Sequence, residues 1–255
     1  MRIVMIGSGN TATVMCVLLN EAGHEIVQVI SRNEINARIL AKKYNAQFDT
    51  LMAPQYADAD IYIIALNDVA LDHVEKYTAL KNKLVVHTAG SVSINSLKVC
   101  GPNYGVLYPL QSVSKESSYI PEIPFLVDGS NPEILHRIIG LAKSISGNVI
   151  EANDTERLNY HIAAVFASNF ANHMFALAEL YCNAERLDFK TLLPLIKEVT
   201  ARAHFHSPFL TQTGPAIRDD IFTLNRHLQA LASHPELKYV YLKMSESIIK
   251  VHGKK

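Results

Sequence analysis

The chain has 255 residues with 24 basic and 24 acidic side chains, so its formal net charge is zero when His is counted as neutral. Hydrophobic residues make up 49% of the sequence, which is enough for a packed core and excludes a disordered chain. Residues 1–152 carry a formal charge of −2 (12 basic, 14 acidic) and residues 153–255 a charge of +2 (12 basic, 10 acidic). Neither part has the basic excess typical of proteins that neutralise phosphates, so we expect no nucleic-acid partner.

The cysteine spacing and one long uncharged segment indicate in which compartment the protein lies and whether it spans a membrane. The three cysteines, Cys16, Cys100 and Cys182, are 84 and 82 residues apart, which favours neither a disulfide framework nor a zinc site. No H-E-x-x-H pattern or carboxylate-rich loop is present, so we expect no metal. Residues 158–178 lack formal charge but hold six Asn, His and Ser side chains, which favours a helix buried in protein over a membrane span. We therefore expect a cytoplasmic protein without a membrane partner.

The first part of the chain alternates two kinds of segment. Short runs rich in Ile and Val predict strands, and the segments between them have helical spacing. The expected strands are residues 2–6, 26–30, 61–65 and 84–86, with weaker candidates at 104–108, 125–128 and 148–151. The expected helices are residues 11–22, 34–44, 68–77 and 132–145. This alternation predicts β-α-β units on a parallel sheet.

The second part is helical throughout. Nine of the eleven glycines precede residue 153, and after it the spacing predicts helices only. They are expected at residues 158–178, with Asp154 as the N-cap, and at 189–205, 216–232 and 236–251. We therefore predict an α/β fold, with an N-terminal Rossmann dinucleotide-binding domain at residues 1–152 and a C-terminal all-helical domain at residues 153–255.

A glycine pattern joins the first strand to the first helix. It reads G-x-G-x-x-A and comprises Gly7, Ser8, Gly9, Asn10, Thr11 and Ala12. Glycines allow a tight turn and close approach to a pyrophosphate, which the helix N-terminus then faces. We expect residues 7–11 to bind a dinucleotide; the alternative is a Gly-rich turn without a ligand.

The residues after the second strand select between NAD and NADP. An NAD site usually has Asp or Glu there, but this chain has Ser31, Arg32 and Asn33. Arg32 can form two parallel bonds to a 2′-phosphate, and the other two side chains can add neutral donors. This predicts NADP as cofactor, unless Arg32 is only a solvated loop residue.

Two further strand ends are candidates for the rest of the cofactor. Leu66 and Asn67 follow the third strand, and His87 follows the fourth. A dinucleotide lies along the carboxyl ends of parallel strands, so we expect these residues to bind it. Asp68 is better explained as a helix N-cap. The alternative for the other polar residues in these loops is that they form hydrogen bonds only with the local backbone.

The polar residues of the 158–178 helix are candidates for the reaction. His161 and Ser168 are seven residues apart and share a helix face, and Asn169 lies one position further round. One hypothesis is that these residues are catalytic, with His161 donating a proton and Asn169 holding the carbonyl or imine group of a substrate. The alternative is a hydrogen-bonded network in the core.

Substrate contacts are expected from two loops. Tyr108 and Gln111 belong to the loop after a weak strand. Arg218 follows the Gly214-Pro215 turn and could bind a substrate carboxylate, or pair with Asp219 or Asp220 as a structural lock.

Several of these stretches together resemble one family, the bacterial putative NADP oxidoreductases with a Rossmann-like domain followed by a helical domain of unknown function. The resemblance rests on residues 6–10, 86–91, 108–112 and 160–169, and on Thr213-Gly214-Pro215 with Arg218 and Asp220. More distantly the chain is similar to pyrroline-5-carboxylate reductase, ketopantoate reductase and the β-hydroxyacid dehydrogenases. The resemblance implies a homodimer built through the helical domain.

Three departures from these patterns matter. The hydroxyacid dehydrogenases have a catalytic Lys four residues before an Asn, and if Asn169 is that Asn, the Lys position is Val165. The missing Lys argues against a simple alcohol dehydrogenase. In the resembled family the Tyr108 position is often His and the Asp219 position is often Gly, and these two differences concern the role of the Tyr108 loop more than the cofactor site.

The residues and the resemblance lead to one main hypothesis. The chain is expected to be an NADP-dependent oxidoreductase that transfers a hydride between NADP(H) and a small carbonyl or imine substrate. Because fold does not fix function, a non-catalytic NADP-binding sensor or partner-binding module remains the alternative. A reductase that uses a deazaflavin as hydride partner is a third possibility.

Overall fold

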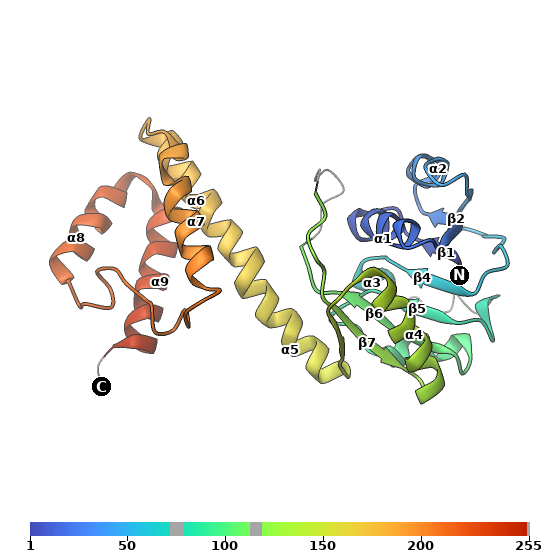
Figure 1. Cartoon of the computed structure of the whole chain (residues 1–255). Helices are drawn as coiled ribbons and strands as arrows, with labels where there is room; N and C mark the ends of the chain where they lie inside the picture. Colours follow the sequence, from blue (N-terminus) through green and yellow to red (C-terminus); the bar gives the residue numbers. More distant parts are fainter. Residues whose placement is uncertain (72–78, 113–118, 254–255) are drawn as a thin grey trace. The chain divides into compact units, whose positions relative to one another are not determined.

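The computed structural model describes residues 1–71, 79–112 and 119–253 (Figure 1). The chain divides into two compact units, residues 1–169 and residues 170–255. The sequence placed its boundary at residues 152 and 153, where strands give way to helices. The compact units instead group the first helix after the sheet with the sheet.

Eight strands form one sheet within the described residues, in the order β3-β2-β1-β4-β5-β6-β7-β8. Neighbouring strands are parallel except β6 and β7, which are antiparallel. The strands are β1 (Arg2–Ile6), β2 (Glu25–Ser31), β3 (Gln47–Thr50), β4 (Ile61–Ile64), β5 (Val85–His87), β6 (Tyr104–Pro109), β7 (Phe125–Gly129) and β8 (Val149–Glu151). The order reverses between β1 and β4, the place where doubly wound sheets bind dinucleotides.

The sequence predicted seven of these strands and missed β3. The missed strand lies at the sheet edge, and its four residues are partly or fully exposed, so it lacks the apolar run of its neighbours. The parallel sheet expected from the first four predicted strands is confirmed, and the β6–β7 pair, for which no direction was predicted, is antiparallel. A parallel pair needs a crossover, usually a helix, whereas an antiparallel pair needs only a loop, and no helical spacing precedes β7.

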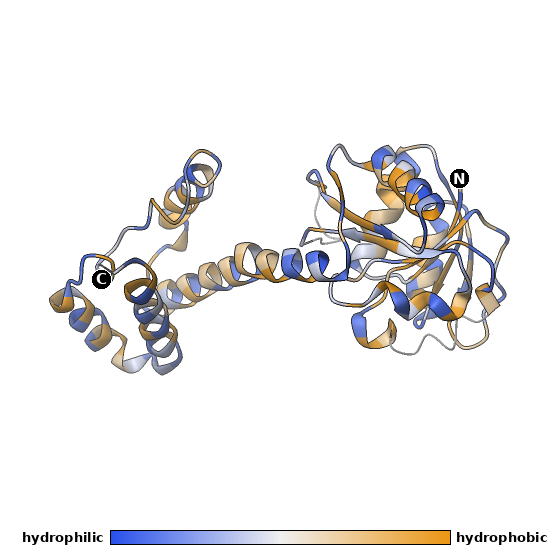
Figure 2. Cartoon of the chain, turned by 90° about the horizontal axis from the view of Figure 1, so that it is seen from below, coloured by the Kyte–Doolittle hydropathy of each residue, from blue (hydrophilic) through white to orange (hydrophobic). Residues whose placement is uncertain are grey.

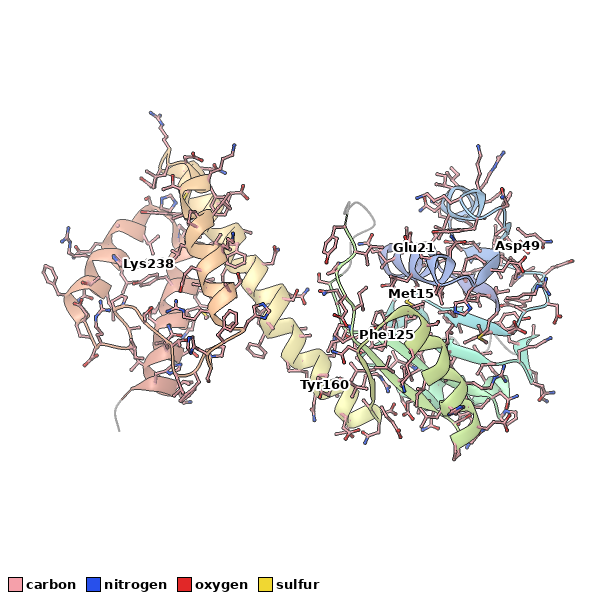
Figure 3. The ribbon with its side chains drawn as sticks, in the orientation of Figure 1. Met15, Glu21, Asp49, Phe125, Tyr160 and Lys238 are labelled. Carbon is pink, nitrogen blue, oxygen red and sulfur yellow. The ribbon has the colours of Figure 1, made fainter. Side chains whose placement is uncertain are left out.

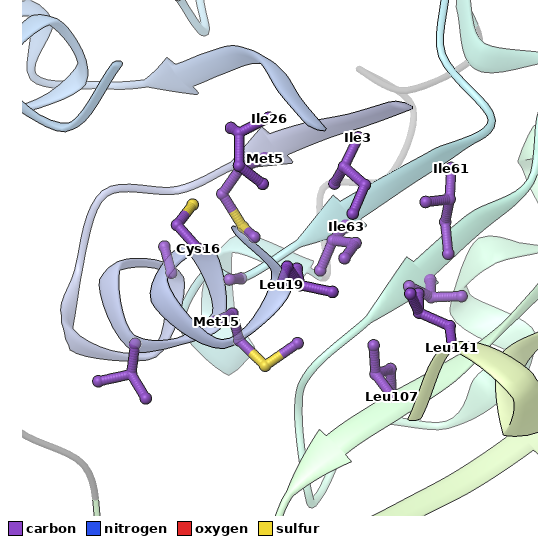
Figure 4. Packing of buried hydrophobic residues seen from close by; sticks show 14 of the residues in the cluster. Ile3, Met5, Met15, Cys16, Leu19, Ile26, Ile61, Ile63, Leu107 and Leu141 are labelled. Carbon is purple, nitrogen blue, oxygen red and sulfur yellow. The ribbon is translucent and has the colours of Figure 1, made fainter. Parts of the chain in front are cut away.

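Both faces of the sheet are covered, and side chains alternate between two apolar clusters. Ile3 and Met5 of β1 point into one cluster (Figure 4), and Val4 and Ile6 point into the other. The first cluster packs against α1 (Asn10–Glu21), α2 (Glu34–Lys42) and α4 (Pro132–Ile145). The second includes Leu71 of α3 (Asp68–Leu71) and residues of the 3₁₀ segment Ile94–Cys100. Burial on both faces explains why the strands read as continuous apolar runs.

One long helical stretch follows the sheet. It begins as α5 (Asp154–Ala164), continues as a π-helix at Val165–Phe170 and ends as α6 (Ala171–Ala184). Its N-cap is Asn153, not the expected Asp154. The Asn153 side chain accepts backbone N–H groups of Thr155 and Glu156, and Glu156 bonds back to complete a capping box.

Burial of this stretch differs from the expectation. Ile162 is 48% exposed and Phe166 is 66% exposed, so the helix is not enclosed within the single chain. The absence of formal charge indicated burial, but these two apolar side chains are exposed.

The second unit contains the rest of the helices. These are the 3₁₀ segment Phe189–Leu192, α7 (Leu193–Arg202), α8 (Ile221–Ala230), the 3₁₀ segment Leu231–Ser233 and α9 (Pro235–His252). The expected helix at 216–232 begins later, because Asp220 caps α8 by accepting the Thr223 backbone N–H. Figure 2 shows apolar and polar residues interleaved along these helices. Among the described residues, none of the helices has the length and hydropathy needed to cross a bilayer.

Candidate functional site

The turn after β1 is built around Gly7. Its φ of +133° is a conformation that side chains rarely adopt, and a Cβ there would overlap the carbonyl oxygen of Ala65 at the end of β4. The Gly7 N–H donates to the Ile30 carbonyl of β2 at 2.7 Å. The turn therefore fits tightly between the ends of two neighbouring strands.

Gly9 has the opposite surroundings. It is the N-cap of α1, and a Cβ at this position would meet nothing within 4 Å. No side chain caps the helix through a hydrogen bond, and its first turn contains no acidic residue. The open space beside Gly9 and the uncapped helix end suit the pyrophosphate of a dinucleotide.

A cavity of about 540 Å³ adjoins the turn between β1, β2 and β4. Its lining consists of Ser8, Gly9, residues 31–33, Asn36, residues 65–67 and Ala70. Ser8 and Ser31 share a hydrogen bond between their hydroxyls at 2.7 Å, and Arg32 is exposed at this cavity. Asn33 uses its Oδ1 to cap α2 through the Asn36 N–H. Asn36 itself was missed by the sequence analysis, because it lies one helical turn inside α2.

A second cavity of about 350 Å³ lies along the same strand ends. Its lining consists of residues 9–11, 65–68 and 88–90, with Tyr108 and His161. Asn67 caps α3 through the Ala70 N–H, so the cap lies one residue before the expected Asp68. The Asp68 carboxylate instead accepts a hydrogen bond from the Ser91 hydroxyl.

The His87 side chain, an expected cofactor contact, is fully buried at the end of β5. The side chain is 0% exposed and is not among the residues that line these cavities. The Ala89 N–H donates to its Nδ1 at 3.2 Å. Burial, together with the nearby Arg157 guanidinium, lowers the pKa of His87 from 6.5 to about 4. The last residue of β5 therefore points into the interior, which strand spacing alone could not show.

Tyr108 of β6 and His161 of α5 form a hydrogen-bonded pair. The Tyr108 hydroxyl and His161 Nδ1 are 2.8 Å apart, and the two rings meet edge to face with centroids 5.9 Å apart. Gly90 makes the contact possible, because a Cβ there would lie 2.8 Å from Tyr108 Cζ and 2.9 Å from His161 Nδ1. Burial, with a contribution from Asp68, raises the pKa of Tyr108. The sequence singled out both residues but did not predict that they meet.

A third cavity of about 540 Å³, here called the chamber, is also lined by this pair. It is lined by Thr11, Thr88, residues 108–112, Tyr160, His161, residues 163–165 and residues 167–169. It therefore brings Gln111, Ser168 and Asn169 together, the last two from the π-helical segment. Thr11, Thr88, Tyr108 and His161 line both this chamber and the second cavity. Figure 3 labels Tyr160 on α5, next to His161.

A buried arginine fixes α5 against the sheet unit. Arg157 is 1% exposed, and its Nη2 donates to the Val92 carbonyl and to Asp154 Oδ1, each at 2.6 Å. Asp154 also accepts hydrogen bonds from the Ser93 hydroxyl and the Ile94 N–H. Because His161 lies four residues after Arg157, this anchor holds the helix face that carries it.

Arg218 belongs to the second unit and is exposed. Asp220 accepts hydrogen bonds from the backbone N–H and hydroxyl of Thr223. Across residues 1–71, 79–112 and 119–253, Arg218 forms no ion pair within 4 Å. The pKa of Asp220 is lowered chiefly by its hydrogen bonds to Thr223, and the charge of Arg218 also contributes. In the same ranges no three His, Cys, Asp or Glu side chains are grouped to hold a metal ion.

Comparison with known proteins identifies the family of the chain. Residues 2–90 match the family model "NADP oxidoreductase coenzyme F420-dependent", and residues 123–248 match "Domain of unknown function (DUF2520)". A solved structure from Bacteroides fragilis, titled a "putative NADP oxidoreductase", is 39% identical, with 98% of each chain covered and a TM-score of 0.90. The chain belongs to this NADP oxidoreductase family. The family description names NADP together with coenzyme F420.

More distant members of the same fold include enzymes. The imine reductase from Myxococcus stipitatus, solved with NADP⁺, is 15% identical and covers 100% of this chain and 96% of its own, with a TM-score of 0.70. The 1-pyrroline-5-carboxylate reductase from Streptococcus pyogenes is 14% identical over 97% of this chain and 98% of its own, with a TM-score of 0.61. At these identities the likeness concerns the fold alone. None of the curated proteins matches the chain.

Proposed function

We propose that the chain is an NADPH-dependent reductase of a small carbonyl or imine compound. The observation that carries the proposal is the Tyr108–His161 pair, which lines both the cavity beside the glycine turn and the chamber. A side chain that can transfer a proton therefore lines both the cavity proposed for the cofactor and the chamber proposed for the substrate.

The glycine turn and its neighbours fit NADP. The backbone at Gly9 has open space for the pyrophosphate, and Arg32, Ser31 and Asn33 surround the cavity where a 2′-phosphate would lie. Leu66 and Asn67 line the same cavity, between the turn and the chamber. When bound, the reduced cofactor supplies the hydride.

His161 is the proposed proton donor. If the Tyr108 hydroxyl donates to His161 Nδ1, the neutral imidazole carries its hydrogen on Nε2. That N–H can give its proton to the carbonyl oxygen or imine nitrogen as the adjacent carbon receives the hydride. In the same step the Tyr108 hydroxyl passes its own proton to Nδ1, so the imidazole stays neutral and Tyr108 is left as a phenolate. His161 is partly exposed, so it can take a new proton from solvent.

The π-helical segment supplies the proposed substrate contacts. Ser168 and Asn169 line the chamber, and their hydroxyl and amide groups can hold a carbonyl or imine. Val165, at the position of the dehydrogenase Lys, lines the same chamber and offers no proton. The role of the missing Lys therefore passes to His161 in this proposal.

The helical domain, residues 153–255, is proposed to form a homodimer interface, while residues 1–152 bind the cofactor. Large apolar side chains of the second unit are exposed, including Leu180 at 56%, Leu195 at 61% and Phe222 at 73%. Soluble monomers rarely leave extended apolar surface uncovered. Light scattering at micromolar concentration should give twice the mass of the 28.3 kDa chain; a monomer mass would contradict the interface.

Titration with NADPH and NADH tests the cofactor site. NADPH should bind at least about tenfold more tightly, which corresponds to about 1.4 kcal/mol. Arg32→Ala should remove that preference. Arg38→Ala is the matched control, since this arginine lies over the Phe48 ring and outside the three cavities. Equal binding of both nucleotides by the unmodified chain would contradict the assignment.

Turnover separates a reductase from a non-catalytic NADP-binding sensor. We expect NADPH oxidation with a ketone or imine, and His161→Ala should lower the rate by about 10²-fold or more while NADPH affinity stays the same. An unchanged rate would remove His161 from the mechanism. NADPH binding without turnover of any carbonyl, imine or deazaflavin compound would favour the sensor.

A further inference from the structure

We infer that the substrate of the chamber carries no carboxylate and is a neutral ketone, aldehyde or imine compound with an apolar substituent. This inference rests on the proposed function and specifies its substrate class. It differs from the expectation drawn from Arg218, which suggested an anionic substrate.

The charge of the chamber is the first observation. None of its fifteen described lining residues is Asp, Glu, Lys or Arg. The polar groups that face it are hydroxyls and amides, as in Gln111, Ser168 and Asn169, together with the His161 imidazole. Such groups hydrogen-bond a carbonyl or an imine well, but they provide no fixed positive charge.

A carboxylate would be poorly accommodated by these groups. Removing its charge from water is costly unless a cation pairs with it, and arginine usually does so with two bonds. The charged side chain on the adjoining cavity is Asp68, which would repel a second carboxylate. Arg157 is buried and bonded to Asp154 and Val92, and it does not line the chamber.

The small side chains on the helical wall of the chamber are the second observation. Ala163 and Ala164 at the end of α5 and Ala167 of the π-helical segment all line the chamber. Small side chains leave the space to the ligand, and about 540 Å³ lies within the usual range of small-molecule pockets. An apolar substituent packed on this wall gains the free energy of burial without needing a charged partner.

A matched pair of unreactive ligands tests the inference. Cyclohexanecarboxamide and cyclohexanecarboxylate have nearly the same shape, and only the second is charged at about pH 7.5. Binding to the NADPH-loaded full chain is measured by calorimetry. The amide should bind at least about tenfold more tightly. Equal affinities, or tighter binding of the carboxylate, would overturn the inference.

Two cations that are not among the described lining residues of the chamber are tested by substitution. Arg218 lies in the second unit, and Lys115 lies outside the described residues. Arg218→Ala and Lys115→Ala should leave the amide-to-carboxylate ratio unchanged. A fall in carboxylate affinity in either variant would show that this side chain supplies a cation to the site, which contradicts the inference.

Adding a cation should reverse the preference. Gln111→Arg places a guanidinium at the chamber, and the amide-to-carboxylate ratio should fall by about tenfold or more. Gln47→Arg is the matched control, because Gln47 is exposed on β3 and outside the three cavities. An equal response in both variants would show that the chamber does not decide the preference.

Turnover distinguishes this inference from the proposed function. The matched pair is 5-methyl-1-pyrroline and 1-pyrroline-5-carboxylate, each offered with NADPH beside a panel of neutral ketones. Turnover of the carboxylate compound at an equal or greater kcat/KM overturns the substrate class and leaves the reductase intact. Absence of all turnover, with the amide still bound more tightly, counts against the reductase and supports a chamber for neutral ligands.

Discussion

His87 provides a prediction whose size follows from the structure. The imidazole is fully buried, and its pKa is lowered from 6.5 to about 4, chiefly by burial. As the pH falls below 6.5, the unfolded chain takes up a proton at this residue while the folded chain does not. The stability that His87 contributes is therefore present above 6.5 and is lost as the pH falls toward 4. At about 1.4 kcal/mol per pKa unit, the loss is about 3 kcal/mol.

The assay is urea unfolding at a series of pH values between about 7.5 and 4. Wild type should lose about 3 kcal/mol more stability across this range than His87→Gln, which has no imidazole to protonate. His136→Gln is the control, since His136 is exposed on α4, and it should follow the wild type. The same pH dependence in wild type and His87→Gln would refute the reasoning.

NADPH titration of the same variant addresses the earlier expectation for this residue. Because the His87 side chain lines none of the three cavities, His87→Gln should bind NADPH with unchanged affinity at about pH 7.5, where it is folded. A large loss of NADPH affinity in a folded variant would support the expectation that the His87 side chain contacts the cofactor.

The glycines give further predictions. Gly7→Ala should destabilise the fold by about 2 kcal/mol or more, measured by urea unfolding, because its φ is +133° and the new Cβ would overlap a strand carbonyl. Gly9→Ala should leave stability within about 1 kcal/mol yet weaken NADPH binding in a titration, since its Cβ would enter the space assigned to the pyrophosphate. Gly90→Ala should lower kcat by separating Tyr108 from His161; an unchanged kcat would show that the pair is dispensable.

The sequence by itself determined the cofactor half of this protein. A strand, a glycine turn and a helix N-terminus follow one another within twelve residues, and the second strand ends at Ser31 beside Arg32. These signals are local, because backbone conformation at Gly7 and the apolar runs of buried strands depend mainly on neighbouring residues. The α/β architecture was predicted from such signals, and membership of the NADP oxidoreductase family from the resemblance of several stretches along the chain; both are confirmed.

The tertiary structure decided the rest. Tyr108 and His161 are 53 residues apart, and only the packing of α5 beside β6, with Gly90 at the contact, brings them within hydrogen-bond distance. The inward direction of His87 and the reversed strand β7 likewise depend on which elements lie against them. Residue types indicate the chemistry that a chain can perform. The direction of a side chain and the contact of residues far apart in the sequence depend on tertiary packing, which no local sequence pattern encodes.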